Sequence, residues 1–276
     1  MWLVLCSAND ISAHWAHHGL KQRGLDPLEM VYAEALPFSL SWEHRVSGSG
    51  VSVSITLPDG RLIDSGSIRG VINRLIAVPS MQVAHSPDGE YATQEFSALF
   101  LSWMYGLPEP VLNRATPQGL CGQWRHVSEW VWLASKAGLP APSYKQTSQD
   151  QINEATTERR LFPLGTPART VIVVNGRACG SDVPPLIREG CKRLSDLAET
   201  SLLGVEFAVD LQSEGPGEKW TFAGATPMPD LRYGGEELLD QLAVILTGRA
   251  VEGQSAAESV QISSNSRQGS STGASL

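Results

Sequence analysis

The sequence predicts an α/β protein with a parallel sheet in its first region and an antiparallel sheet with helices in its second. Over residues 1–142, short continuous apolar runs alternate with helix-length amphipathic stretches, as in a parallel sheet covered on both faces. Over residues 143–249, turns of Asn-Gly and Gly-Pro-Gly type separate the expected strands, which is typical of hairpins. Residues 250–276 form a Ser-rich tail with few large aliphatic side chains, and we expect it to be disordered.

The first region opens with the apolar run 2–6, a polar turn, a helix to Arg23 and a second strand over 28–35. Such an opening builds a parallel sheet, and the turn after its first strand is the usual position for a ligand. Residues 51–57 and 61–63 flank a Pro-Asp-Gly turn, which predicts a hairpin. A further strand is expected over 68–74.

A long helix is expected from Ser86-Pro87-Asp88, where a capping acceptor, a proline and a carboxylate stand in the positions that favour a helix start. Its apolar residues recur at helical spacing as far as Met104, and Gly106 ends it. A short strand at 111–113 and a helix from Val127 to Gly138 complete the region. Three tryptophans in or beside these apolar stripes are expected in the core: Trp103, Trp130 and Trp132.

The second region contains apolar strands at 170–174, 203–209 and 220–225. One helix precedes the second of these strands, with an apolar face formed by Ile187, Cys191, Leu194 and Ala198. Another helix begins near Glu236. The pattern predicts an antiparallel sheet with two helices packed on it.

Composition excludes several classes of protein. The 276 residues carry 21 Lys and Arg against 29 Asp and Glu, a net charge of −8, which disfavours nucleic acid as a partner. The apolar run at the start is too short for a signal peptide or a membrane span, so we expect a cytoplasmic protein without a membrane partner. Four widely spaced cysteines indicate neither a disulfide framework nor a zinc site, and reduced thiols are expected.

Common catalytic motifs are missing from the sequence. Ser102, Ser128 and Ser135 lack the Gly-x-Ser-x-Gly elbow of hydrolases, no Gly-x-Gly-x-x-Gly follows the first strand, and there is no P-loop. His14 and His18 lie four apart in one helix, but no Glu follows the first of them, which favours a solvated or interdomain helix face over a metal pair. Asn73-Arg74 and Asn113-Arg114 each follow a strand; they are either ligand-binding groups at the carboxyl edge of the sheet or ordinary loop polarity.

Four stretches in order carry a resemblance to a known family: 87–103 with 111–113, 128–142, 170–177, and 193–207 with 220–229. Their order resembles the ATP-grasp superfamily, in particular the carboxylate–amine ligases that modify ribosomal proteins or graspetide precursor peptides. The resemblance implies a pre-ATP-grasp-like domain over 1–142 and a truncated ATP-grasp-like domain over 143–249. Ligases of this family activate a carboxylate as an acyl phosphate, which requires Mg²⁺ on the ATP phosphates.

The family takes its metal ligands from two neighbouring strands, an acid on one and Glu-x-Asn on the next. Glu206 matches the first acid, but when Pro229 sets the register, Gly224 and Thr226 stand where the family has Glu and Asn. Asp210 and Asp230 are the further candidate metal ligands, and Glu218 is another if the register shifts. Two of the three expected ligands are therefore missing at their usual positions.

The nucleotide-binding half also differs from the family. Between residues 142 and 170 the sequence has one lysine, Lys145, and one glycine, so the family's nucleotide clamp is shortened or absent. The candidate cofactor-binding residues are Lys145, by the resemblance, and Asn113 and Arg74, by their position after the strands of the parallel sheet. It makes Arg169 and Arg193 the candidate catalytic residues that neutralise phosphate. Binding of ATP and Mg²⁺ is accordingly expected to be weak or lost.

Three hypotheses follow from the sequence. The leading one is an ATP-grasp-like pseudoenzyme with a degenerate ATP and Mg²⁺ site, whose interdomain cleft binds a peptide, a small-molecule carboxylate or a partner enzyme. The second is an active ATP-dependent carboxylate–amine ligase that modifies a peptide through an acyl phosphate. The third is an unrelated scaffold with a chance resemblance. Whether the protein is an enzyme is left open at this point.

Overall fold

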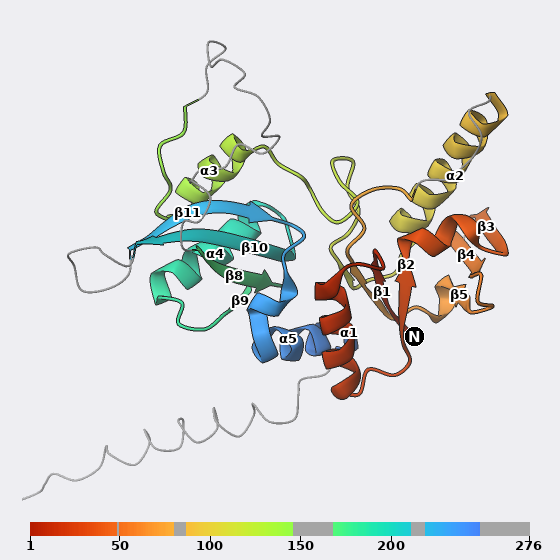
Figure 1. Cartoon of the computed structure of the whole chain (residues 1–276), viewed down its shortest axis with the longest axis horizontal. Coiled ribbons are helices and arrows are strands. Elements are labelled where there is room, and N and C mark those ends of the chain that lie inside the picture. The colour runs from red at the N-terminus through yellow and green to blue at the C-terminus, as the bar shows by residue number, and fades with distance from the viewer. Residues whose placement is uncertain (49, 80–86, 146–167, 211–218, 249–276) are drawn as a thin grey trace, which may run out of the picture.

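The computed structural model describes residues 1–48, 50–79, 87–145, 168–210 and 219–248, in which the chain forms three β-sheets with helices packed on them (Figure 1). The first is the expected parallel sheet, with strand order β2-β1-β6-β7 and every neighbouring pair parallel. Its strands are β1 (Trp2–Cys6), β2 (Leu28–Tyr32), β6 (Gly70–Asn73) and β7 (Val111–Leu112).

Helix α1 (Ile11–Gln22) connects the first two strands, and its small apolar residues face the core. The second strand ends at Tyr32, earlier than the expected residue 35, because the chain turns there into the 3-10 helix η1 (Ala33–Phe38). Pro37 lies inside η1, and since proline has no N–H it favours such a turn over a longer strand.

A second, three-stranded sheet has the order β3-β4-β5, with β3 (Ser41–Ser47), β4 (Gly50–Thr56) and β5 (Leu62–Asp64). The hairpin of β4 and β5 confirms the expectation from the Pro-Asp-Gly turn. Strand β3 was not predicted. Helix α2 (Pro87–Gly106) packs on this sheet through Phe100, Trp103 and Met104, which are buried. The 3-10 helix η2 (Ser65–Ser67) leads from β5 to β6.

The third sheet is antiparallel and has the order β11-β10-β8-β9. Its strands are β8 (Ala168–Val174), β9 (Arg177–Cys179), β10 (Leu202–Asp210) and β11 (Lys219–Thr226). Helices α3 (Val127–Lys136) and α4 (Pro185–Leu197) cover one face. After the 3-10 helix η3 (Leu231–Gly234), helix α5 (Gly235–Thr247) packs on part of the other face.

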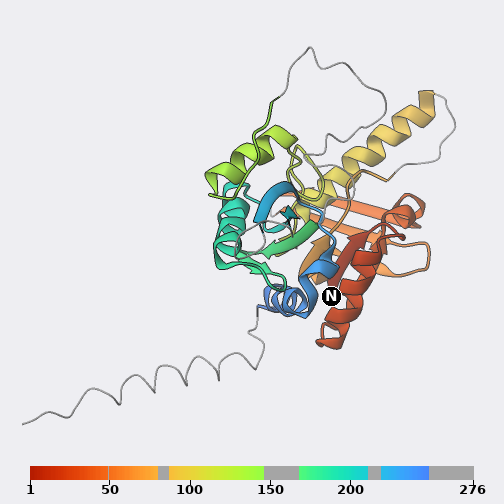
Figure 2. The ribbon, with the colours of Figure 1, turned by 60° about the vertical axis from the view of Figure 1, so that its left-hand side comes forward.

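The two regions share one hydrophobic core. Helices α1 and α5 lie side by side in both views (Figures 1 and 2), and their apolar side chains join those of β1 and β8 in a single buried cluster. Leu20 of α1 and Leu239 of α5 are both buried in it. This shared core fixes the position of the antiparallel sheet against the parallel one, while the division into domains at residues 142 and 249 stays a prediction.

The expectations for the tryptophans hold for two of the three residues. Trp103 and Trp130 are buried, whereas the Trp132 side chain is 58% exposed. Helix α3 turns Trp130, Val131 and Ala134 toward the sheet, so Trp132 points away from it, and the Lys136 ammonium lies 5.8 Å from its ring.

Some expectations concern residues outside the described ranges. The tail 250–276, the capping residue Ser86 and the candidate metal ligand Glu218 all lie there. Within the described ranges, none of the helices combines the length and the apolar character needed to cross a membrane.

Candidate functional site

The turn between β1 and α1 is held by two carboxylates. Asp10 caps α1 by accepting a hydrogen bond from the Ala13 N–H at 2.9 Å. Glu34 accepts hydrogen bonds from Ser7 Oγ at 2.6 Å and from the Ala8 N–H at 3.1 Å. Partial burial alone would raise the pKa of Glu34, but these hydrogen bonds outweigh it and hold the pKa below its ordinary value.

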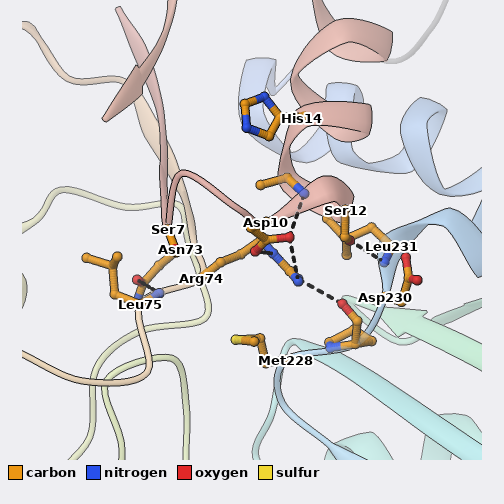
Figure 3. A network of polar contacts seen from close by, with 12 residues as sticks. Ser7, Asp10, Ser12, His14, Asn73, Arg74, Leu75, Met228, Asp230 and Leu231 are labelled. Atoms are coloured by element: carbon orange, nitrogen blue, oxygen red, sulfur yellow. Dashed lines mark hydrogen bonds and ion pairs between the residues drawn. The ribbon is translucent and has the colours of Figure 1, made fainter. Parts of the chain in front are cut away.

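Arg74, at the end of β6, links this turn to the second region of the chain (Figure 3). Its Nε and Nη2 atoms donate to the Asp10 carboxylate at 2.6 and 3.3 Å, and its Nη1 atom donates to the Pro229 carbonyl at 2.8 Å. The Arg74 side chain is 4% exposed and that of Asp10 is 12% exposed. A buried guanidinium with all three nitrogens bound is a rigid element of the site.

The segment that follows β11 reaches back to α1. The Leu231 N–H donates to Ser12 Oγ at 2.7 Å, and Asp230 caps the 3-10 helix η3. Arg232 forms an ion pair with Asp230 at 2.6 Å. Its guanidinium, together with a backbone hydrogen bond and the more distant charge of Arg74, holds the pKa of Asp230 below its usual range.

These groups form the floor and one wall of a crevice between the two regions. Its part beside α1 has a volume of about 480 Å³ and includes Asn9, Ile11, Met228 and Asp230 in its lining. An adjoining part of about 360 Å³ lies between Glu34, Phe38 and residues 75–79. Ser7, Arg74 and Ile76 line both parts. Crevices at the carboxyl ends of parallel strands are where α/β folds bind ligands.

Asn113 ties the segment after β11, which borders the crevice, to the start of β10. Its Nδ2 atom donates to the Leu202 and Pro227 carbonyls at 2.7 and 2.8 Å, and its Oδ1 atom accepts from the Leu202 N–H at 2.8 Å. Gly204 of β10 lets Pro229 pass close to the strand, since a Cβ on Gly204 would lie 2.6 Å from the Cβ of Pro229. The structure thus brings two candidate residues, Arg74 and Asn113, to the segment 227–230, which contains a third candidate, Asp230.

Glu206 lies apart from this crevice, on the third sheet. Val205 and Phe207, its neighbours in β10, face α3 and α4, so Glu206 points to the opposite face, where its side chain is exposed. It pairs with Thr170 of β8 and Gly224 of β11. A Cβ on Gly224 would lie 3.9 Å from Glu206 Oε2 and would meet nothing else within 4 Å.

Among the described side chains, this face offers a magnesium ion one carboxylate, the smallest number that such sites use. Mg²⁺ needs six oxygen ligands, of which the protein usually gives one or two carboxylates. Glu206 is the acid present, and its strand neighbours are glycine and threonine. Over the described part of the chain, no group of three His, Cys, Asp or Glu side chains could hold a metal ion. The side chain of Asp210 lies outside the described residues, and the metal roles of Glu206, Asp210 and Asp230 stay predictions.

The candidate phosphate and nucleotide residues lie away from Glu206. Arg193 of α4 donates to the Ala137 carbonyl at 2.8 Å, on the helix-covered side of the sheet. By strand alternation Arg169 of β8 shares the face of Val171, which is also that side. Lys145 is exposed beyond α3. The sheet therefore separates both arginines from Glu206, and their catalytic roles, like the cofactor role of Lys145, remain predictions.

The histidines of α1 make local contacts. His14 Nε2 lies 3.0 Å from the Ala8 carbonyl oxygen, His17 Nε2 lies 3.1 Å from that of Leu28, and His18 contacts Gln22. This arrangement fits the expected solvated helix face.

Sequence reasoning missed Asp10, Ser12 and Glu34 as parts of the site. The polar turn Ser7–Asp10 directly after the first strand was the available signal, because it marks the usual ligand position. The turn alone could not reveal the partner of Asp10, because that partner, Arg74, lies 64 residues further along the chain.

Comparison with known proteins identifies the fold. No family model and no curated protein matches the sequence. Solved structures do match. Macrocyclase MdnC of Microcystis aeruginosa, solved bound with precursor peptide MdnA, is 11% identical, with a TM-score of 0.65 over 90% of this chain and 100% of that chain.

Two ATP-grasp ligases match similarly. PsnB, complexed with a phosphomimetic variant of its minimal precursor, Mg and ADP, is 15% identical, with a TM-score of 0.63 over 90% of this chain and 97% of that one. A RiPP-associated ligase of Chryseobacterium gregarium, in complex with ADP and a leader and core peptide, is 10% identical, with a TM-score of 0.60 over 91% and 97%.

The chain therefore has an ATP-grasp fold. More narrowly, it has the form of that fold found in ligases that were solved with precursor peptides. This confirms both the predicted fold class and the resemblance drawn from the order of the sequence stretches. At these identities the likeness concerns the fold, and activity has to be argued from the residues of this chain.

Proposed function

We propose that this protein binds a peptide in the crevice between its two regions and has no complete magnesium–ATP site of its own. The observation that carries the proposal is the pairing of Glu206 with Gly224, which puts a glycine where the family resemblance implies a second acidic metal ligand. Peptide as the partner is supported by the fold, because MdnC and PsnB were solved with precursor peptides.

The crevice has the chemistry that a peptide requires. Ile11 and Ile76 are 65% and 58% exposed at its rim, so they can pack on apolar side chains of a bound segment. The Asp230–Arg232 pair and Asn9 offer hydrogen bonds to a peptide backbone. The Arg74–Asp10 pair below them is already satisfied by protein groups and keeps the floor in place.

The nucleotide part of the proposal is tested by calorimetry with Mg²⁺ and the uncleavable analogue AMPPNP. We expect no saturable binding below about 1 mM, an affinity of about 4 kcal/mol. Micromolar binding that disappears in Glu206→Ala would overturn the proposal, because it would show that Glu206 completes a working metal site.

The peptide part is tested with a displayed random-peptide library on the immobilised full chain. Selection should enrich a common sequence pattern, and Ile76→Glu should abolish that enrichment because it puts a charge at the apolar rim. Leu186→Glu is the matched control, since Leu186 is an 84% exposed aliphatic side chain on α4, outside the crevice. Enrichment that survives Ile76→Glu contradicts binding in the crevice.

An active ATP-dependent carboxylate–amine ligase is the second candidate. It is favoured by the fold, since the ATP-grasp ligases that match were solved with ADP and, for PsnB, with Mg. Glu206, exposed on the open sheet face, would be its first metal ligand. Peptide-dependent release of ADP that is lost in Glu206→Gln would establish this candidate. Two further points remain expectations. One is a cytoplasmic location, and the other is a small-molecule carboxylate or a partner enzyme, in place of a peptide, in the crevice.

A further inference from the structure

Glu34 holds a carboxylate in a fixed position inside the crevice. It stands in the first turn of η1, directly after β2, and lines the smaller part of the crevice, which has a volume of about 360 Å³. Its oxygens accept hydrogen bonds from Ser7 Oγ and from the Ala8 N–H, at 2.6 and 3.1 Å. Both donors are neutral, so they orient the carboxylate without cancelling its charge. Glu34 is exposed, which leaves that charge accessible to a ligand.

The other two carboxylates of the crevice are neutralised by the protein itself. Asp10 accepts two hydrogen bonds from the Arg74 guanidinium, and Asp230 forms an ion pair with Arg232. Within the described ranges, no Lys, Arg or His side chain forms an ion pair with Glu34. The crevice therefore has one negative charge that the described part of the chain does not compensate.

The thiol of Cys6 is affected by the same imbalance. Cys6 is the last residue of β1 and lies beside the turn that carries these groups. Burial, the largest cause, and the negative charges of Asp10 and Glu34 raise the pKa of this thiol to about 12, while Arg74 acts in the opposite direction. Two carboxylates and one guanidinium thus act on the same point, which leaves an excess of one negative charge.

The rest of the smaller part of the crevice is mainly apolar. Phe38 is 62% exposed there, and Ile76, Val78 and Pro79 continue the lining. The Arg74 guanidinium borders the same space, but all three of its nitrogens are already bound to protein groups. A ligand that fits carries a positive charge at the end of an apolar stem, which is the form of lysine and arginine side chains. The face of an aromatic ring such as Phe38 attracts a cation as well.

We propose that the smaller part of the crevice binds a basic side chain of the peptide, with its charge on the Glu34 carboxylate and its aliphatic stem against Phe38 and Ile76. This inference rests on the proposed function, because it names the class of peptide that the crevice takes. The larger part of the crevice, of about 480 Å³ beside α1, remains for the neighbouring residues of the peptide. A hydrogen bond between two charged groups is roughly twice as strong as one between neutral groups, so the basic side chain is an anchor of the peptide.

Selection of displayed random peptides on the immobilised full chain tests this assignment. On the native chain, one position of the enriched pattern should be lysine or arginine. Glu34→Gln keeps the shape of the side chain and removes its charge, so the basic preference should fall about 10-fold while the apolar part of the pattern stays. Glu34→Lys should replace the basic preference by a preference for aspartate or glutamate. A chain that merely misfolds would not gain such a preference.

Two controls separate the Glu34 charge from other causes. Glu189→Gln removes an exposed carboxylate that pairs with Lys192 on α4, outside the crevice, and should leave the basic preference as it is. Spermidine carries positive charges on apolar stems without a peptide, and calorimetry should show no saturable binding of it below about 1 mM. Micromolar binding of spermidine that is lost in Glu34→Gln would assign the site to a free amine and overturn the assignment to a peptide.

The selection also distinguishes this inference from the proposed function. An enriched pattern that is lost in Ile76→Glu but has no basic position overturns the inference and leaves peptide binding in the crevice intact. A basic position that survives both Glu34→Gln and Glu34→Lys overturns it too, because another group then binds the charge. A selection that enriches no pattern contradicts the proposed function, and the inference fails with it.

Discussion

Glu206 and Gly224 lie directly opposite each other on β10 and β11, and the space beside the Glu206 carboxylate is open at the position of the glycine. A bulge follows at once, since the next residue of β10, Phe207, pairs with Phe222. The φ angle of Gly224 lies outside the left-handed region, so a side chain fits there without backbone strain. The backbone at position 224 would therefore accommodate a second acid beside Glu206.

Gly224→Glu should create a binding site for Mg²⁺ with nucleotide. A second carboxylate near Glu206 adds a negative charge beside a divalent cation, and we expect AMPPNP with Mg²⁺ to bind about 10- to 100-fold more tightly than to the native chain. Calorimetry measures the change. Gly224→Gln has the same shape without the charge and should leave binding as in the native chain. Equal gains in affinity in both variants would show that a missing negative charge is not the reason for weak nucleotide binding in the native chain.

The ion pair of Arg74 with Asp10 should contribute strongly to stability. Arg74→Met leaves the Asp10 carboxylate buried without its cation and the Pro229 carbonyl without its donor, and we expect a loss of about 3–5 kcal/mol in urea unfolding. Asp10→Asn combined with Arg74→Met should cost less than the sum of the single changes, because the two residues form one network.

Arg232→Met is the control for that measurement. Arg232 pairs with Asp230 in the same crevice but is exposed, so its removal should leave the unfolding midpoint within error. Strictly additive effects of Asp10→Asn and Arg74→Met would contradict a shared network.

Local patterns were sufficient to predict most elements. The continuous apolar run 2–6 is a fully buried strand, and the stripe of Ile187, Cys191 and Leu194 is the buried face of α4. Strand β3 escaped prediction because its apolar residues alternate with a charged pair at a free edge, so its sequence looks like a polar loop. Trp132 was misplaced because residues two positions apart on a helix, such as Trp130 and Trp132 of α3, point in different directions.

The site was less predictable than the fold. Arg74 binds the Asp10 carboxylate across 64 residues of the first region, and it binds the Pro229 carbonyl only when the two regions pack together; no local pattern reports contacts between residues so far apart. Glu206 and Gly224 were located through the family resemblance, with Pro229 as the register, and in the structure they lie opposite each other on β10 and β11. The contacts between the loops had no such template.

Asn113 should be as important for stability as the ion pair of Arg74 with Asp10, although it carries no charge. Its amide binds three backbone groups, two on Leu202 and one on Pro227, and it is 3% exposed. Asn113→Ala leaves those groups buried without partners, which should cost about 3–5 kcal/mol in urea unfolding. Hydrogen exchange of the Leu202 amide should accelerate as well. Asn9→Ala, at an exposed asparagine of the crevice, should change neither quantity.

The four cysteines should make the fold sensitive to alkali. All four are buried, and burial raises the pKa of Cys6, Cys179 and Cys191 to about 12 and that of Cys121 to about 11. In the unfolded chain a thiol ionises near pH 8.5. Their contribution to stability is therefore complete below about pH 8.5 and is lost as the pH rises toward the folded values, by about 1–2 kcal/mol per thiol at pH 10.

Urea unfolding between pH 8 and pH 11 measures this loss, and Cys191→Val tests its origin. Removing one thiol should reduce the downward slope of the free energy of unfolding by about 1 kcal/mol per pH unit between pH 9 and pH 11. Ellman's reagent gives an independent readout: at pH 8 the folded chain should react only as fast as it opens, whereas the urea-unfolded chain should release four equivalents at once. Rapid reaction of the folded chain would mean that at least one thiol is accessible, and the alkaline slope would then have another cause.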